Sequence, residues 1–157
     1  MPSTHKKVIV RKMDRDTVAG FVAPVFLVDD KVEMLNTAGN VVSIELRDIK
    51  GVYFVRDFTD FDAPGRKTFV TRPRTAGLWV RLKFRDNEII EGMMPNDLAQ
   101  IAPEGYFINP PDTRSNTQRI FVPRTALQEL TVLAVIGAAA RRRAAGEDER
   151  QVGLFQE

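Results

Sequence analysis

Hydrophobic and polar residues alternate in two stretches of the chain, and both stretches have the same order of features. In residues 80–85 the even positions are hydrophobic and the odd positions are basic. This period of two predicts a β-strand with one face in a core. The polar turn Asp86-Asn87-Glu88 follows, and a second apolar run ends at Gly92. Because Asp and Asn are common turn residues, the stretch predicts a β-hairpin.

The first stretch, residues 8–20, has its turn at Asp14-Arg15-Asp16 and its glycine at Gly20. A shift of 72 residues superimposes it on residues 80–92, so that Gly20 coincides with Gly92. A shift of 78 superimposes apolar positions that follow the two stretches. It places Ile44, Ile49 and Val52 on Val122, Leu127 and Leu130. Such internal similarity predicts two copies of one small structural unit.

Each copy is expected to contain five short strands. After the hairpin, the pattern predicts one strand at Val32–Leu35 in the first copy and one at Tyr106–Ile108 in the second. Five strands in so short a segment predict a strongly bent sheet closed into a small barrel. The two closing strands of each copy are expected at Val41–Leu46 with Val52–Val55, and at Arg119–Val122 with Leu127–Val135.

The chain then divides into a first repeat at 6–55, a linker at 56–77, a second repeat at 78–137 and a tail at 138–157. The linker contains two Gly, two Pro and three Asp and has no sustained apolar period. These features leave open whether a further strand forms around Thr68–Thr71. The tail begins with good helix formers, but an isolated helix of this length is marginal in water, so we expect it to be flexible.

The layout V-x-V-x-F-x-D-G-x-x-x-x-G, followed by a closing F-V-x-x-x-A-x-x-x-V, matches Val80–Gly92 and Phe121–Leu130, with a looser copy at Val8–Gly20 and Ile44–Val52. In this layout the chain resembles a bacterial tandem-repeat domain of unknown function over about residues 6–136. The resemblance implies a mostly β fold with two small Sm/SH3-like barrels packed together, and it carries no assigned activity. Arg15 and Asn87 stand where a turn glycine is usual.

The composition is that of a soluble globular protein. The 157 residues are 43% hydrophobic and 28% charged, with a net charge of +2 and no cysteine. The missing cysteine excludes disulfides and thiolate chemistry. The N-terminus lacks the apolar core of a signal peptide, and the longest apolar run, Val132–Ala140, is shorter than the ~20 residues that span a bilayer. We therefore expect a cytoplasmic protein with no membrane partner.

Catalytic residues are not evident. The single histidine, His5, lies in the N-terminal segment and cannot form an acid–base pair within the fold. Acidic clusters at Asp29-Asp30 and at Asp57, Asp60 and Asp62 lack the spacing of a calcium loop, and Asp is common in solvated turns. We expect no metal, no cofactor and no enzymatic activity.

A cyclic-dinucleotide site is also not expected. Arg11 and Arg15 form an R-x-x-x-R, which PilZ-type barrels combine with a later D-x-S-x-x-G to bind a guanine dinucleotide. The second half of that motif is absent from the sequence. Two arginines at this spacing on a strand and its turn are common without it.

A basic segment is the first candidate binding surface. Residues 63–85 contain seven basic residues and no acidic one, and Trp79 shares the outward parity of the basic positions that follow it. Basic groups that neutralise phosphates beside a stacking aromatic ring are typical of single-stranded nucleic acid binding. The alternative is a solvated strand whose charge Asp86, Glu88 and Glu91 neutralise. The candidate residues are Arg72, Arg74, Trp79, Arg81, Lys83 and Arg85.

The C-terminal peptide is the second candidate. Gln151, Leu154 and Phe155 form a Q-x-x-L-F that resembles the peptide by which bacterial replication and repair proteins bind the DNA sliding clamp. The Leu-Phe pair offers an apolar anchor for a pocket, and the glutamine adds a polar contact. Alternatively, Leu154 and Phe155 pack back against the barrels.

The run Leu130–Ile136 is expected to be a buried closing strand, with a dimer-forming edge strand as the alternative. Taken together, these patterns favour a non-enzymatic binding or adaptor protein that docks on the sliding clamp through its tail. The alternatives are an Sm-like nucleic-acid-binding barrel that uses strand 79–85, and an adaptor in signalling that recognises a protein through a barrel edge.

Overall fold

The computed structural model describes residues 4–58, 67–112 and 114–137, and almost all of its regular structure is β-strand. The first repeat contains β1 (Lys6–Lys12), β2 (Thr17–Val22), β3 (Leu27–Val28), β4 (Lys31–Asn36), β5 (Val41–Glu45) and β6 (Ile49–Val55). The second contains β7 (Gly77–Phe84), β8 (Ile89–Met94), β9 (Gly105–Ile108), β10 (Thr117–Pro123) and β11 (Leu127–Ile136). Single 3₁₀ turns lie at Leu46–Asp48, Leu98–Gln100 and Arg124–Ala126. The expected mostly β fold is confirmed, and each expected strand of the repeats is present with slightly different bounds.

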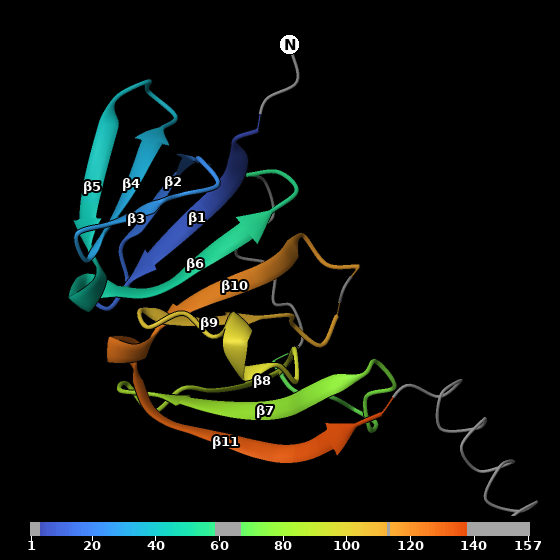
Figure 1. Ribbon diagram of the computed structural model, residues 1–157. Helices are drawn as coiled ribbons and strands as arrows, with labels where there is room; N and C mark the ends of the chain where they lie inside the picture. Colours follow the sequence, from blue (N-terminus) through green and yellow to red (C-terminus); the bar gives the residue numbers. More distant parts are fainter. Residues whose placement is uncertain (1–3, 59–66, 113, 138–157) are drawn as a thin grey trace, which may run out of the picture.

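The strands do not form two separate barrels. One sheet runs through both repeats in the order β3-β4-β2-β1-β6-β10-β9, with β5 paired to β4, and a three-stranded sheet has the order β11-β7-β8 (Figure 1). The repeats are joined where β6 pairs antiparallel with β10. The expectation of closed barrels was therefore wrong, because β6, the last strand of the first repeat, pairs with β10 of the second repeat.

The strand pairing nevertheless has the same register in both repeats. Val8 of β1 lies opposite Gly20 and Phe54, and Val80 of β7 lies opposite Gly92 and Val132. The shifts of 72 and 78 seen in the sequence thus hold in three dimensions. Strands β4 and β9 correspond at a shift of 74, and the pair Phe21–Leu35 corresponds to the bridge Met93–Asn109.

The two hairpin turns are also alike. Arg15 and Asn87 both have a left-handed backbone, with φ of 76° and 73°. In each turn an aspartate side chain accepts a hydrogen bond from the backbone N–H two residues later, Asp14 from Asp16 and Asp86 from Glu88. Such side-chain acceptors stabilise a tight turn without glycine.

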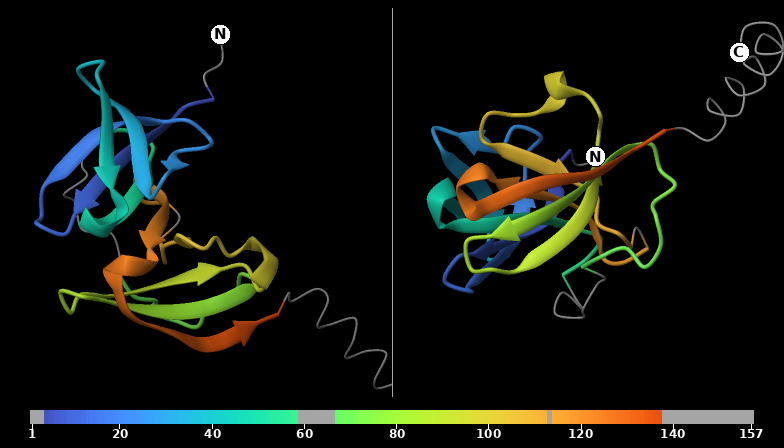
Figure 2. Two further views of the ribbon diagram at one scale, coloured as in Figure 1. Left: turned by 60° about the vertical axis from the view of Figure 1, so that its left-hand side comes forward. Right: turned by 90° about the horizontal axis from the view of Figure 1, so that it is seen from below.

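The core consists of two clusters of buried side chains that share residues across the repeats. Phe121 of β10 belongs to the cluster of the first repeat, while Met13 and Tyr53 pack against the cluster of the second. The two repeats lie one above the other and form one continuous body (Figure 2). Because each cluster borrows side chains from the other repeat, we expect them to fold cooperatively.

Residues 68–71 form bends and no strand, which answers the question that the sequence left open for this segment. One further expectation needs correction. The run Leu130–Ile136 is only partly buried, because β11 pairs with β7 alone among the described strands and exposes Val132 and Val135. The tail 138–157 lies outside the described residues.

Candidate functional site

The basic face of β7 is matched by acidic residues on its neighbouring strands. Arg81 is exposed and lies opposite Glu91 of β8, while Lys83 is half-buried and lies opposite Glu129 of β11. Opposite charges at facing positions of a sheet stabilise the pair. Arg85 is exposed, and its guanidinium donates to the carbonyl of Arg47 at 3.2 Å. The positive charge of this strand is thus partly compensated within the protein.

Trp79 is half-buried and holds a neighbouring segment in place. Its indole N–H donates to Glu91 Oε1 at 3.1 Å, and the same oxygen accepts from the backbone N–H of Phe69 at 3.1 Å. The Phe69 and Trp79 rings meet edge to face with centroids 6.0 Å apart. The expected outward parity of Trp79 is correct, but its ring supports the segment after Lys67. Arg72 and Arg74 are exposed on that segment, and Pro73 between them is buried.

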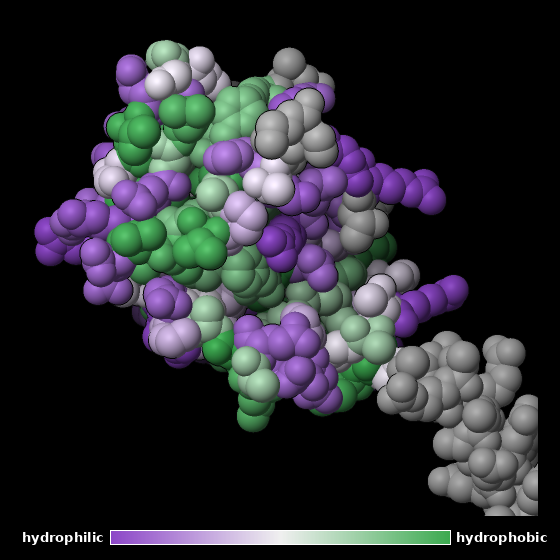
Figure 3. Space-filling model, turned by 45° about the horizontal axis from the view of Figure 1, so that its top comes forward, coloured by the Kyte–Doolittle hydropathy of each residue, from purple (hydrophilic) through white to green (hydrophobic). Residues whose placement is uncertain are grey.

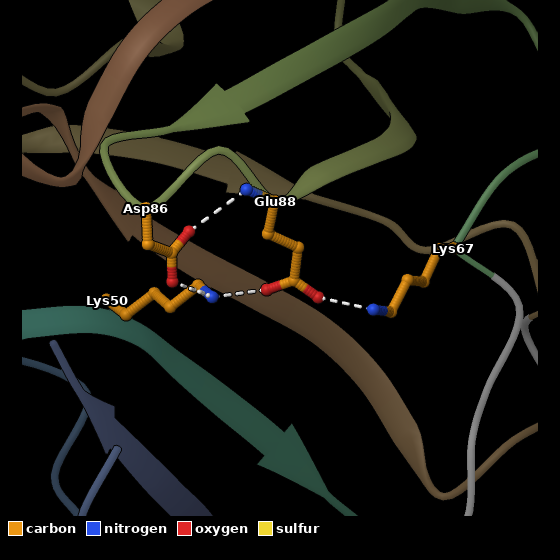
Figure 4. Close-up of polar contacts among 4 residues, drawn as sticks. All are labelled: Lys50, Lys67, Asp86 and Glu88. Atoms are coloured by element: carbon orange, nitrogen blue, oxygen red, sulfur yellow. Dashed lines mark hydrogen bonds and ion pairs between the residues drawn. The ribbon is translucent and has the colours of Figure 1, made fainter. Parts of the chain in front are cut away.

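An ion-pair network joins the two repeats (Figure 4). Lys50 projects from β6, and its ammonium group contacts Asp86 at 2.6 Å and also Glu88, both in the β7–β8 hairpin of the other repeat. Glu88 in turn pairs with Lys67 at 2.7 Å. The Lys50 side chain is only 10% exposed and also lies 5.0 Å from the centroid of the Phe84 ring.

The pKa directions in this network follow from its hydrogen bonds. Burial opposes the charge on Lys50, but hydrogen bonds to Asp86 and Glu88 outweigh it and raise the lysine pKa. Burial likewise opposes ionisation of Asp86 and Glu88, yet their hydrogen bonds to Lys50 lower both carboxyl pKa values. Since the charged forms stabilise one another, we interpret the network as a structural joint between the repeats.

A shallow hollow lies beside Arg119, on the strand β10 that runs between β6 and β9. Arg119 of β10 places its guanidinium over the rings of Phe54 and Phe107, 4.8 and 4.5 Å from their centroids. The hollow measures about 160 Å³, which is smaller than typical ligand pockets of ~300–1,000 Å³. The side chains that line it include Asp97, Gln100, Tyr106, Asn109 and Arg119. Arg119 was not singled out from the sequence, because nothing there shows that β10 passes between two phenylalanines.

Five strands pair with one other strand alone in the part of the chain that the structure describes: β3, β5, β8, β9 and β11. Strand β3 has two residues, and β8 and β9 meet each other at the bridge Met93–Asn109, so β5 and β11 offer the longer open edges. Strand β5 pairs with β4 alone, and β11 pairs with β7 alone. Val41 on β5 is 77% exposed, and Val132 on β11 is 48% exposed. Hydrophobic side chains are visible at the surface on the side of the molecule where β3, β4 and β5 lie (Figure 3). An open edge with exposed valines is a surface that can accept another strand.

The remaining candidates have structural roles or lie outside the described residues. Asp29 and Asp30 both have left-handed backbones and form the turn between β3 and β4, and no cluster of metal-ligating groups occurs among residues 4–58, 67–112 and 114–137. Arg11 lies over the ring of Tyr53 at 5.8 Å, and Arg15 occupies the first hairpin turn. In these same ranges no helix is long and apolar enough to cross a membrane. The peptide residues Gln151, Leu154 and Phe155 are not described.

Comparison with known proteins identifies a family without an assigned activity. A model described as a family of unknown function (DUF6982) matches residues 4–134, which include every strand up to most of β11. No curated protein and no solved structure matches the chain. The expected likeness to an uncharacterised domain is confirmed in this general form. The chain therefore belongs to the family of unknown function DUF6982.

Proposed function

We propose that this protein is a binding adaptor that recognises other polypeptides by strand pairing at the open edges of β5 and β11. The observation that carries the proposal is the pair of edges on β5 and β11, each with an exposed valine, Val41 and Val132. An open edge presents unpaired N–H and C=O groups, and a partner strand gains affinity by hydrogen bonding to them. The side chains beside the edge then supply specificity.

Composition of the edges supports this function. Neither β5 (VVSIE) nor β11 (LQELTVLAVI) contains proline or lysine, the residues that most often protect an edge from pairing. The register of β11 against β7 shifts at two places, which locally interrupts the edge and limits how much of it can be used. The charged groups described above stabilise the fold, so they are less available for a ligand.

We also infer that the two repeats arose by duplication of one open, Sm/SH3-like unit. The inference is supported by the matched pairing registers, in which β1, β2, β4, β5 and β6 correspond to β7, β8, β9, β10 and β11. Duplication makes a binding role natural, because a small β unit of this kind has no chemistry of its own.

The adaptor function is tested by affinity capture from the native cell with the full-length chain. Val41→Lys and Val132→Lys add a charge to each edge, and Val25→Lys adds the same charge at a loop position that is also 77% exposed. We expect wild type and Val25→Lys to retain a common set of proteins that the two edge variants lose. Identical sets from all four proteins would exclude binding through the edges.

The C-terminal peptide supports a second candidate function, docking on the DNA sliding clamp. Leu154 and Phe155 would insert into an apolar pocket, with Gln151 hydrogen-bonding at its rim. Titration of purified clamp with wild type, with Leu154→Ala/Phe155→Ala and with the control Val152→Ala tests it. We expect only the double variant to lose binding, and equal binding or no binding by all three would exclude the proposal.

A further inference from the structure

We propose that the partner of these edges is a second copy of the same chain: β11 of one copy pairs with β5 of the next, head to tail. The inference rests on the proposed function, since it names the polypeptide that the open edges accept. The two repeats already pair within one chain through the kind of strand contact that the two copies would form.

The internal joint between the repeats is a strand pair of a defined type. The last strand of the first repeat, β6, pairs with β10, which is the second-to-last strand of the second repeat. Within each repeat these two positions are the outer strands, because β6 and β11 otherwise pair only with β1 and β7, and β5 and β10 only with β4 and β9. One joint of this type therefore uses β6 and β10 and leaves β5 and β11 open.

The correspondence between the repeats gives the register of the second joint. Phe54 lies opposite Arg119 in the internal pair, Tyr53 opposite Ile120 and Val52 opposite Phe121. The shift of 78 that relates β6 to β11 and β5 to β10 converts these three pairs into contacts between two copies. They become Val132 opposite Val41 of the second copy, Thr131 opposite Val42 and Leu130 opposite Ser43.

This register brings together the two exposed valines. Val132 and Val41 are 48% and 77% exposed in the single chain, and strand pairing would place them face to face and remove apolar surface from water. The internal joint alone fixes this register, and side-chain exposure does not enter into it. That it pairs an exposed valine with an exposed valine is independent support for the proposal.

The second joint would be weaker than the internal one. Lys50, which pairs with Asp86 and Glu88 across the internal joint, corresponds to Gln128 on β11, and the two carboxylates correspond to Asp14 and Asp16. An amide can donate a hydrogen bond to a carboxylate but carries no charge. The register shift between Val132 and Ala134 also ends the regular stretch of β11 at Val132. Association between copies is therefore reversible and depends on concentration.

The geometry excludes pairing of the two edges within one chain. Strand β5 lies at one end of the molecule and β11 at the opposite end (Figure 1 and the left view of Figure 2). Each copy thus offers one edge of each kind. Unlike surfaces that pair in this way build a ring where the rotation between copies closes, and an open chain where it does not.

The first experiment measures molecular mass against protein concentration by light scattering coupled to gel filtration. We expect wild type and Val25→Lys to form assemblies larger than a dimer, and Val41→Lys and Val132→Lys each to be monomeric. An equimolar mixture of the two edge variants retains one intact β11 and one intact β5. The mixture is therefore expected to form dimers and nothing larger.

The second experiment uses the absence of cysteine from the sequence. Facing residues in an antiparallel pair have Cα atoms ~4.5–5.5 Å apart, which is within the range that a disulfide spans. Under mild oxidation, Val41→Cys mixed with Val132→Cys is expected to give a cross-linked dimer. Val25→Cys mixed with Val132→Cys is the control and is expected to give none.

Each outcome decides the proposal. Monomeric wild type at every concentration, or cross-linking of Val132→Cys with itself and not with Val41→Cys, would overturn head-to-tail pairing. If the chain is monomeric while the edge variants still lose proteins in affinity capture, the proposed adaptor function stands and only the identity of the partner is wrong. If neither experiment responds to the edge substitutions, both proposals fail.

Discussion

The ammonium group of Lys50 lies 2.6 Å from the Asp86 carboxylate, and this ion pair joins strand β6 of the first repeat to the hairpin turn of the second. The same group contacts Glu88, so one lysine satisfies two carboxylates of a single turn. Because Lys50 is largely buried, loss of its charge leaves the two carboxylates unpaired, and loss of the carboxylate charges leaves the lysine unpaired. The joint therefore makes the stability of the whole protein depend on pH.

Lys50→Met is predicted to destabilise the protein by about 1–2 kcal/mol near neutral pH. Loss of one member of a buried ion pair costs ~3–5 kcal/mol, and the figure is reduced here because the Asp86 side chain is 39% exposed. Because folding lowers the pKa values of Asp86 and Glu88, these carboxylates stabilise the fold at pH values above their ordinary pKa values of 3.8 and 4.5. This contribution is lost as the pH falls through their lowered pKa values in the folded protein. The raised lysine pKa stabilises below 10.5, and its contribution is lost as the pH rises through the folded value.

The difference in stability between wild type and Lys50→Met is therefore expected to be largest between about pH 5 and pH 10. Urea denaturation across this range measures it, with Lys6→Met, an exposed substitution on β1, as the control. A difference that stays constant down to pH 3 would show that the ion pairs are not its source.

Arg15→Gly is predicted to stabilise the protein by about 0.5–1 kcal/mol, and Asn87→Gly by less. Both residues have a left-handed backbone, which costs an ordinary side chain ~1–2 kcal/mol, whereas asparagine tolerates it better. The greater freedom of glycine in the unfolded chain offsets part of the gain. Chemical denaturation of the two variants measures the order, and a larger gain for Asn87→Gly would contradict the assignment of strain to Arg15.

The sequence predicted much of this fold because its repeat restricts the alternatives. Alternating positions such as Val80, Leu82 and Phe84 are all fully buried, as their period requires. The turn aspartates at 14 and 86 and the glycines at 20 and 92 mark the same hairpin twice. Local patterns of this kind depend on neighbouring residues, so they can be read without the tertiary structure.

Contacts between the repeats could not be predicted in the same way. Nothing in the pattern of β6 and β10 shows that they pair with each other instead of closing two barrels, because both are apolar strands with two usable edges. The role of Trp79 was also missed, because its hydrogen-bond partner Glu91 lies on a neighbouring strand and the parity of a strand does not reveal whether an outward ring is covered. Arg119 gave no signal because the rings beside it come from different repeats.

Gly20→Ala and Gly92→Ala are predicted to destabilise the protein by at least about 2 kcal/mol, in the upper range for overpacking. An added methyl group would collide with the Leu35 carbonyl in the first case and with Ile108 in the second. Gly39→Ala is the comparison, since its methyl group has open space and only its positive φ of 90° is unfavourable. Denaturation midpoints measure the three changes. An equal loss at all three positions would contradict the prediction that the close approach of the neighbouring strand requires glycine at positions 20 and 92.

Substitutions on β7 distinguish two roles for this basic strand, a structural role and the binding of nucleic acid. Trp79→Phe keeps the aromatic face that could stack on a base but removes the N–H that donates to Glu91. The structural interpretation predicts a loss of about 1 kcal/mol in stability from the missing hydrogen bond. It also predicts that Arg81→Glu/Lys83→Glu leaves any binding of single-stranded DNA or RNA unchanged, because Glu91 and Glu129 already face these positions.

The nucleic-acid alternative predicts the opposite result for the charge reversal. Binding would fall steeply with added salt, and Arg81→Glu/Lys83→Glu would weaken it and reduce the salt dependence, since each lost phosphate contact lowers the number of counterions released. Fluorescence anisotropy with labelled single strands at several salt concentrations measures both quantities, and Arg56→Glu, an exposed arginine outside this strand, is the control. Salt-dependent binding that only Arg81→Glu/Lys83→Glu weakens would assign the β7 face to nucleic acid. The hydrogen bond from Trp79 to Glu91 would then have to break when the nucleic acid binds.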